Sequence, residues 1–196
     1  MPAPERLSRD YFTRNTVQVA RGLLGTRLVR LEGYQRVGGL IVETEAYRGE
    51  EDQACHARAG RTKRTQVMYG QPGHAYVYFT YGKHWMLNIV TEAEGYPAAV
   101  LIRAILPDEG AALIAARRNS QPPARWTDGP AKLCQALHID GNQHGLDLCD
   151  PQSEILVESG IDVPDSDVAV SARVGLNTVP EPWKSMPWRF RLIDLT

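Results

Sequence analysis

Leu40-Ile-Val-Glu-Thr-Glu-Ala-Tyr47 is the stretch that decides the fold. It begins as an apolar run typical of a buried β-strand and ends with two acids and a tyrosine. Residues i and i+2 of a strand share a face, so Glu43, Glu45 and Tyr47 point the same way. Carboxylates on a buried face are costly unless they line a polar cleft. Two interpretations are open: the row belongs to a cleft, or the strand twists out and leaves the acids in solvent.

The composition is that of one globular domain. The chain has 196 residues, of which 43% are hydrophobic, and this is enough apolar material for a single core. We predict one domain over residues 1–196, with residues 1–10 loosely ordered. No run approaches the ~20 apolar residues of a membrane helix, and the polar N-terminus lacks the apolar region of a signal peptide. We therefore expect no membrane partner.

Cysteine usage, motifs and charge narrow the function. Cys55, Cys134 and Cys149 are widely spaced, which argues for a reducing compartment and against a disulfide framework or a CxxC zinc site. The sequence has no HExxH, P-loop or GxSxG motif, so we expect no metal, no other cofactor and no serine nucleophile. The formal net charge is −1, so any binding of nucleic acid must come from a local basic surface.

Hydrophobic periodicity and turn residues predict an α+β fold, a mainly antiparallel curved sheet with several short helices. Gly33-Tyr34 marks a hairpin turn, and Gly38-Gly39 marks a bulge. Residues 48–72 have no clear period, and loops of that length are usually functional or disordered. Helices are predicted over 16–24, from Asp108 through Arg118 and over 131–137, and strands over 26–32, 36–47, 74–80, 84–90, 98–106, 154–158, 168–174 and 188–193.

The clearest hairpin joins the strands over 74–80 and 84–90 and protrudes with Tyr81-Gly82-Lys83 at its tip. Gly82 supplies the positive φ that the turn requires. Tyr81 either folds back onto its own hairpin or enters a partner as a wedge, as bulky side chains of minor-groove proteins do. Lys83 and the bases of residues 58–64 either contact phosphates or form a solvated face.

Aromatic and charged side chains inside apolar strands are further candidates. Tyr76 and Tyr78 share a strand face, where their rings either stack on a base or belong to an ordinary core. Arg103 interrupts a buried strand and must be paired, with Glu43 or Glu45 as its natural partner. Both a structural and a catalytic ion pair fit this pattern.

Taken together, these motifs resemble those of the alkyladenine (3-methyladenine) DNA glycosylases of the human alkyladenine-glycosylase type, from about Leu23 to Leu192. The loop Gly60-Arg-Thr-Lys-Arg-Thr65 departs from the GRTPRN common in the family, and the segment after Asn88 is slightly longer than in the human enzyme. The resemblance rests on Val42-Glu-Thr-Glu-Ala-Tyr47, Asp52 to His56, Pro72-Gly73, Tyr76-Val-Tyr78, Tyr81-Gly82, Asn88, Leu101-Ile-Arg103, Gly129-Pro-Ala-Lys-Leu-Cys-Gln-Ala-Leu137, Ser171-Ala-Arg-Val-Gly175 and Arg189-Phe190.

The resemblance implies a monofunctional DNA glycosylase of base excision repair. Such an enzyme flips alkylated or deaminated purines out of double-stranded DNA and hydrolyses the N-glycosidic bond with water activated by a single glutamate, leaving an abasic site. Glu45 is implied as the general base, with Arg103 and the main-chain carbonyl of Leu192 holding the water.

The resemblance also assigns contacts to the substrate. Tyr47, His56 and Tyr78 are implied as walls that stack on the flipped base, and Asn88 as the residue that disfavours guanine by crowding its 2-amino group. Tyr81 is implied as the residue that intercalates from the minor groove. The further DNA contacts are Gly82, Lys83, Arg61, Arg64, Met68 and Lys132.

One carboxylate suffices for this chemistry on a cationic base. An N3- or N7-alkylated purine already carries positive charge and leaves without a general acid, so Glu45 has only to position and deprotonate water. A neutral lesion such as hypoxanthine requires an acid, for which His56 is the candidate. The matched pocket motifs contain no lysine, so we expect no Schiff-base lyase step. Glu43 receives no catalytic role.

Two alternatives from other classes stay open. A non-catalytic damage-binding protein would capture flipped bases, but it has no use for a water-activating pair such as Glu45 and Arg103. An unrelated small-molecule enzyme could share the architecture, because a fold does not fix a function, although the tip Tyr81-Gly82-Lys83 argues against it. We expect a monomer, cytoplasmic and associated with the nucleoid in a prokaryote or nuclear in a eukaryote.

Overall fold

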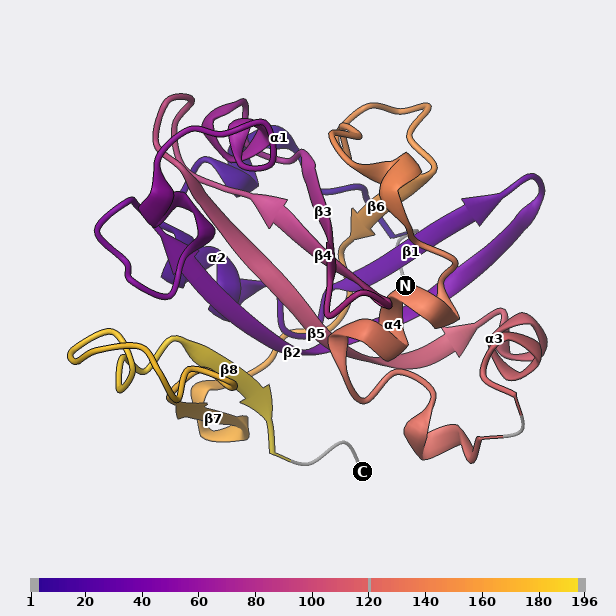
Figure 1. Ribbon diagram of the computed structural model, residues 1–196. Coiled ribbons are helices and arrows are strands. Elements are labelled where there is room, and N and C mark those ends of the chain that lie inside the picture. Colours follow the sequence, from indigo (N-terminus) through magenta and orange to yellow (C-terminus); the bar gives the residue numbers. More distant parts are fainter. Residues whose placement is uncertain (1–3, 120, 194–196) are drawn as a thin grey trace.

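The computed structural model describes residues 4–119 and 121–193 and has the α+β architecture that the sequence predicts (Figure 1). Its centre is an eight-stranded sheet with the strand path β3-β4-β5-β2-β1-β6, and β8 adds to it by pairing with β2 and β7. Every pairing of these strands is antiparallel.

The elements follow one another closely along the chain. The strands are β1 (Arg27–Glu32), β2 (Gln35–Arg48), β3 (Ala75–Thr80), β4 (His84–Val90), β5 (Ala98–Glu109), β6 (Ile155–Glu158), β7 (Val168–Ser171) and β8 (Arg189–Leu192). The α-helices are α1 (Arg9–Phe12), α2 (Thr16–Gly22), α3 (Ala111–Arg117) and α4 (Pro130–Ala136). Short 3-10 helices are η1 (His56–Ala59), η2 (Gln66–Tyr69), η3 (Pro123–Arg125), η4 (Gly141–Gln143) and η5 (Asp165–Asp167).

β2 is the strand around which the sheet is arranged. Along one edge, residues 35–40 pair with β1 and residues 43–45 with β8; along the other edge, residues 38–48 pair with β5. The predicted bulge is confirmed, because the register with β5 shifts between Gly38 and Gly39. A Cβ on Gly39 would lie 2.0 Å from the carbonyl oxygen of Leu106, so only glycine allows this close approach of the two strands.

β3 and β4 form the predicted hairpin, with an unbroken register between them. Gly82 has a φ of 68°, as the turn prediction requires. Tyr81 also adopts a positive φ, of 51°, which is uncommon for a non-glycine residue. Its side chain is 84% exposed at the tip, so it does not fold back onto its own hairpin.

Some predicted elements differ at their ends. β5 continues to Glu109, because Asp108 and Glu109 form ion pairs with Arg27 on β1. The helix expected from Asp108 therefore begins only after Gly110, whose φ is 72°. The strand predicted over 168–174 ends at Ser171, which pairs with the first residue of β8. The long loop over 48–72 contains η1 and η2.

The main core lies between the sheet and the helices. Val19 of α2, Ile114 of α3 and Leu133 of α4 are fully buried against apolar residues of the central strands. A second, smaller cluster around Cys55, Met68, Tyr76 and Ala99 joins the long loop to the sheet. This second cluster carries the candidate site.

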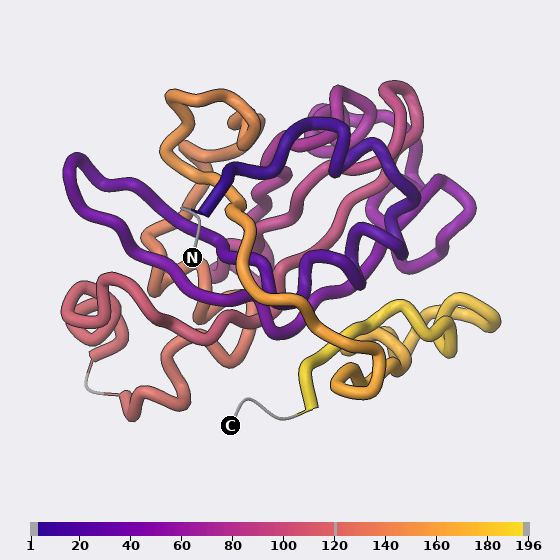
Figure 2. The backbone as a smooth tube through the Cα atoms, turned by 180° about the vertical axis from the view of Figure 1, so that it is seen from behind, coloured from indigo at the N-terminus to yellow at the C-terminus, as the bar shows by residue number. Residues whose placement is uncertain are grey.

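The N-terminal segment runs beside β6 behind the sheet (Figure 2). Arg6 Nη1 donates to the carbonyl of Leu148 at 2.8 Å, and the Leu7 N–H donates to the carbonyl of Val157 at 2.8 Å. Of residues 1–10, which we expected to be loosely ordered, 1–3 lie outside the described part of the chain. Within the described ranges, no helix is both long enough and apolar enough to cross a membrane.

Candidate active site

A pocket of about 340 Å³ opens where the second half of β2 meets β3, β4 and β5. Its walls come from segments far apart in the sequence, namely the long loop with η1, the β3–β4 hairpin and the segment that follows β7. The residues that line it are Tyr47, Ala54, Cys55, His56, Met68, Tyr76, Tyr78, Thr80, Tyr81, Met86, Asn88, Ala99, Leu101, Arg103, Pro130, Val174, Gly175 and Leu176.

Aromatic rings form much of this wall. Tyr47 comes from β2, Tyr78 from β3 and His56 from η1, so the three residues predicted to surround a base line one cavity. The rings of His56 and Tyr78 meet edge-on with their centroids 4.6 Å apart. Tyr76 is a fourth ring, and its hydroxyl lies 2.9 Å from Nδ1 of His56.

His56 is a neutral imidazole at physiological pH. Burial, together with the positive charges of Arg64 and Arg58, lowers the pKa of His56 to about 4. Arg64 Nη2 lies 3.5 Å from Nε2 of the ring and, as a donor only, needs a lone pair there. Nδ1 then carries the proton and donates to the Tyr76 hydroxyl. An imidazole in this state is a poor proton donor, which counts against His56 as a general acid.

Glu45 is fully buried directly behind the pocket lining. Its Oε1 accepts a hydrogen bond from the Val174 N–H at 2.7 Å, and its Oε2 accepts from the Tyr47 hydroxyl at 2.8 Å and from Arg103 Nη1 at 3.3 Å. Burial and the Glu45 carboxylate raise the pKa of Tyr47 well above its ordinary value, so its hydroxyl stays protonated and donates. The acids of this strand therefore belong to a polar cleft and are not turned to solvent.

Glu43 joins two arginines beneath the same cleft. Its Oε1 accepts from Arg103 Nε at 2.6 Å and from Arg189 Nε at 2.7 Å. Arg103 therefore contacts both Glu43 and Glu45, which the sequence had offered as alternative partners. The register shifts of β2 against β5 on either side of Glu43 accompany this arrangement.

Arg173 and Val174 bear directly on the site, although sequence reasoning assigned them no role. The Arg173 guanidinium donates to both carboxylate oxygens of Asp52, at 2.6 and 2.9 Å, and neither side chain reaches solvent. It also lies over the Tyr47 ring, 4.6 Å from the centroid. This ion pair ties the segment after β7 to the long loop and so places the Val174 N–H on Glu45. In the sequence, Asp52 and Arg173 appeared only as members of two matched motifs, 52–56 and 171–175.

Asn88 and Met68 lie inside the pocket. Asn88 is 4% exposed, and its Nδ2 donates to the carbonyl of Tyr76 at 3.0 Å, which holds the side chain in one orientation. Met68 was expected at the DNA surface, but it is 1% exposed and belongs to the smaller core cluster. Met68 lies in η2 with its side chain directed inward, so it lines the pocket. Among the described residues, no group of three or more His, Cys, Asp or Glu side chains is arranged to hold a metal ion.

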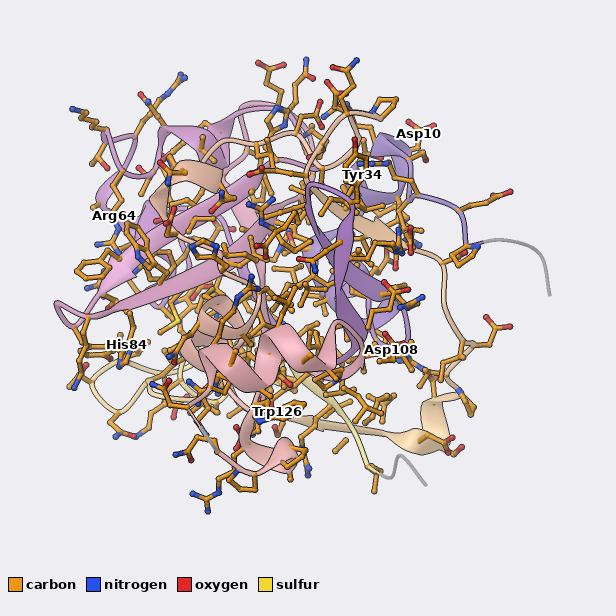
Figure 3. The ribbon with its side chains drawn as sticks, turned by 90° about the vertical axis from the view of Figure 1, so that its right-hand side faces the viewer. Asp10, Tyr34, Arg64, His84, Asp108 and Trp126 are labelled. Carbon is orange, nitrogen blue, oxygen red and sulfur yellow. The ribbon has the colours of Figure 1, made fainter. Side chains whose placement is uncertain are left out.

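The other residues predicted to contact DNA lie at the surface. Arg61, Arg64, Gly82 and Lys83 are exposed, and the Arg64 guanidinium lies 4.9 Å from the centroid of the Tyr78 ring. Lys132 is half-buried and pairs with Asp128 at 2.7 Å, so its charge is already balanced. Figure 3 shows Arg64 and His84 on the side of the molecule where the β3–β4 hairpin ends, away from Asp10.

Leu192 is the last residue of β8 and is not among the residues that line the pocket. Leu192 pairs with Val168 of β7, and its side chain packs in the main core. The β8 residue opposite Glu45 is Arg189, and the backbone group that contacts Glu45 is the N–H of Val174. The water-holding role that the resemblance implied for the main-chain carbonyl of Leu192 stays a prediction.

Comparison with known proteins identifies the family of this chain. A model of the methylpurine-DNA glycosylase family matches residues 10–195. A protein of Methanocella arvoryzae is 48% identical over 188 residues, which cover 94% of this chain and 90% of the relative. One of Desulfitobacterium hafniense is 45% identical over 200 residues, covering 97% and 96%. Both relatives are provisionally named 3-methyladenine DNA glycosylases.

The chain belongs to the methylpurine-DNA glycosylase family. This confirms the family expected from the sequence and, with it, the enzyme class, a hydrolase that acts on N-glycosyl bonds of alkylated bases in DNA. The alternative of an unrelated small-molecule enzyme is thereby excluded.

Proposed function

We propose that this protein is a monomeric, monofunctional glycosylase that flips damaged purines out of duplex DNA and hydrolyses their N-glycosidic bond with water activated by Glu45. The observation that carries the proposal is the fully buried Glu45 carboxylate, held by donors from Tyr47, Arg103 and Val174 directly behind an aromatic pocket. A buried charge is costly to maintain. A protein that only captured flipped bases would gain nothing from it.

The reaction needs one proton acceptor and a way in for water. Attack of water on the sugar C1′ breaks the bond to the purine, the bonding electron pair leaves with the base, and Glu45 takes the proton of the water. A carboxylate has about four acceptor sites and three of those of Glu45 are taken, so water either binds at the remaining site or displaces a donor on the pocket side. Arg103 Nη1, at 3.3 Å, is the most distant of the three and belongs to a pocket-lining side chain. A water between Arg103 and Glu45 then sits at the inner end of the pocket.

The pocket and the hairpin suit a flipped purine. The volume of the pocket falls within the roughly 300–1,000 Å³ of small-molecule sites. Stacking of the base on rings such as those of Tyr47 and Tyr78 contributes about 1–3 kcal/mol per base. Asn88, fixed by its bond to Tyr76, sits where it can crowd the 2-amino group of guanine. The exposed Tyr81 at the tip enters the minor groove and fills the gap that the base leaves.

The state of His56 bears on the range of lesions. Cationic alkylated purines leave without an acid, whereas a deaminated purine such as hypoxanthine must be protonated. Because the pKa of His56 is lowered to about 4, this residue is neutral at pH 7 and supplies little acid catalysis. We therefore infer that deaminated purines are substrates but react more slowly than alkylated ones.

Glu45→Gln tests the proposal. General-base catalysis contributes about 10²–10⁴-fold, so single-turnover release of 3-methyladenine from a defined duplex should fall by at least about 10²-fold. Binding to a duplex with an uncleavable abasic analogue should be retained. The control is Glu158→Gln, since Glu158 is another buried glutamate, paired with Arg36 at the far edge of the sheet. Undiminished release of base by Glu45→Gln would exclude the mechanism.

A further inference from the structure

Glu43 is a charged residue beneath the site to which the proposed mechanism gives no role. It lies under the pocket, is 8% exposed and is not one of the side chains that line the cavity. One carboxylate oxygen, Oε1, accepts hydrogen bonds from the guanidinium Nε of Arg103 at 2.6 Å and from that of Arg189 at 2.7 Å. An ordinary ion pair joins one arginine to one carboxylate, whereas here two arginines donate to the same buried oxygen.

The geometry of Arg103 explains what this contact does. A guanidinium is a rigid planar fork, so anchoring its Nε sets the direction of both terminal nitrogens. With Nε held by Glu43, Nη1 of Arg103 is directed toward Oε2 of Glu45. Burial opposes the charge of Arg103, but Glu45 and Glu43 outweigh that effect and raise the pKa of Arg103 above its ordinary value. Arg103 is therefore a permanent cation whose direction depends on Glu43.

Charge balance is the second part of the arrangement. β8 places Arg189 opposite Glu45 in the sheet, yet the Arg189 guanidinium turns to Glu43. Two carboxylates and two guanidinium groups thus form a neutral set beneath the pocket. Without Glu43, two cations would face the single Glu45 carboxylate.

We propose that Glu43, together with Arg189, is a positioning element for the water-activating pair: it aims Arg103 at Glu45 and balances the charge around that carboxylate. The proposal rests on the proposed function of Glu45. Glu43 itself touches neither the pocket nor the reacting atoms, so it is a positioning residue and not a catalytic one.

The pH dependence of base release depends on the charged and titratable groups that face Glu45 from each element around it. Glu43 and Tyr47 face it from β2, Arg103 from β5 and Arg189 from β8. Val174 contributes an uncharged N–H, Tyr78 lies further along the pocket wall, and Arg173 behind Tyr47 is neutralised by Asp52. Glu43 and Arg189 are the members that can be changed without removing a pocket-lining side chain.

The experiment measures single-turnover release of 3-methyladenine against pH for four proteins. A displacement of about 1 Å costs roughly 10²-fold in rate, so Glu43→Gln should slow release by about that factor and leave affinity for abasic-analogue duplex unchanged. Its acid limb should move to lower pH by about 1 unit, because a neighbouring like charge is lost. Arg189→Gln should move the acid limb to higher pH, because a neighbouring opposite charge is lost. The double variant Glu43→Gln/Arg189→Gln should return the limb toward that of the wild type.

Glu158→Gln is the matched control, and the melting temperature of each protein is measured beside its rate. A purely structural Glu43 would lower the melting temperature and leave the acid limb in place, which would overturn the proposal. If Glu43→Gln does not fold, the upward shift in Arg189→Gln, whose side chain is 25% exposed, still decides it. If Glu45→Gln is inactive but Glu43→Gln and Arg189→Gln are both fully active, this inference is overturned and the proposed function stands. Absence of base release by the wild type would overturn it together with the proposed function.

Discussion

Replacing Asp52 by asparagine removes one charge from an ion pair that solvent does not reach. The Asp52 carboxylate receives two hydrogen bonds from Arg173, at 2.6 and 2.9 Å, and the side chains of both residues are 0% exposed. The Arg173 guanidinium also donates to the carbonyls of Ala46 and Trp183. It lies over the rings of Tyr47 and Trp188. None of these neighbours replaces the lost negative charge.

The expected loss of stability is large. Breaking a buried ion pair by removing one partner costs about 3–5 kcal/mol. For a chain of this size, 1 kcal/mol corresponds to about 2–4 °C in melting temperature, so Asp52→Asn should melt roughly 6–20 °C below the wild type. Asp165→Asn is the control, since Asp165 also pairs with an arginine, Arg21, but its carboxylate is 97% exposed. Exposed pairs contribute about 0–1 kcal/mol.

Scanning calorimetry of the three proteins tests this, with far-UV circular dichroism as a check on the fold. Asp52→Asn/Arg173→Met should recover part of the loss, because the uncompensated guanidinium is gone. Asp52→Asn should also slow base release at temperatures where it is folded, since the ion pair places the Val174 N–H on Glu45. A melting temperature within about 2 °C of the wild type would refute the reasoning.

Two further predictions concern the hairpin tip and His56. Tyr81→Ala should weaken binding to lesion duplex roughly 10- to 100-fold, the equivalent of about 1–3 kcal/mol of lost stacking. Tyr34→Ala, which removes another exposed tyrosine from the β1–β2 turn, should leave binding unchanged. Titration at several salt concentrations measures both affinities, and equal affinities would count against a wedge. The pKa of His56 is about 4 in the folded protein and 6.5 as its ordinary value, so the unfolded chain binds the proton more tightly. The stability that His56 contributes is therefore complete above pH 6.5 and falls by up to about 3 kcal/mol as the pH drops toward 4. Urea unfolding of the wild type and His56→Gln at pH 7.5 and 4.5 measures this as a difference that shrinks at low pH, and a constant difference would contradict it.

Local signals were sufficient for most of the fold. Gly82 between two β-branched and aromatic runs predicted the β3–β4 hairpin, because glycine readily adopts the positive φ of the turn. Gly38-Gly39 predicted the bulge in β2, where a side chain on Gly39 would collide with the carbonyl of Leu106. The start of α3 was misplaced, since Asp108 looks like a helix cap in sequence but pairs with Arg27 on β1, 81 residues away. The long loop over 48–72 showed no period because η1 and η2 are too short to produce one.

The candidate site divides in the same way. Tyr47, His56, Tyr78 and Asn88 were identified through matched motifs, and the structure places all four around one cavity. Arg173 and Val174 lay in a matched motif without an assigned role, because their contacts with Asp52 and Glu45 join segments more than 120 residues apart. The role implied for the main-chain carbonyl of Leu192 stays a prediction, because a match in a four-residue strand carries little information about register.

By itself, the sequence determined that β2 carries Glu43, Glu45 and Tyr47 at alternate positions, because strand geometry directs alternate side chains to one face. It determined, for an equally local reason, that Tyr81 lies at a hairpin tip, whereas the structure showed that its side chain is exposed there. Only the tertiary structure decided that Glu45 is enclosed by Tyr47, Arg103 and Val174, and that Glu43 holds Arg103 and Arg189 together. The physical reason is that the donors come from β2, β5, β8 and the segment after β7. Their meeting depends on the register shifts of β2 against β5 on either side of Glu43 and on the pairing of β8 with β2, which no local pattern encodes.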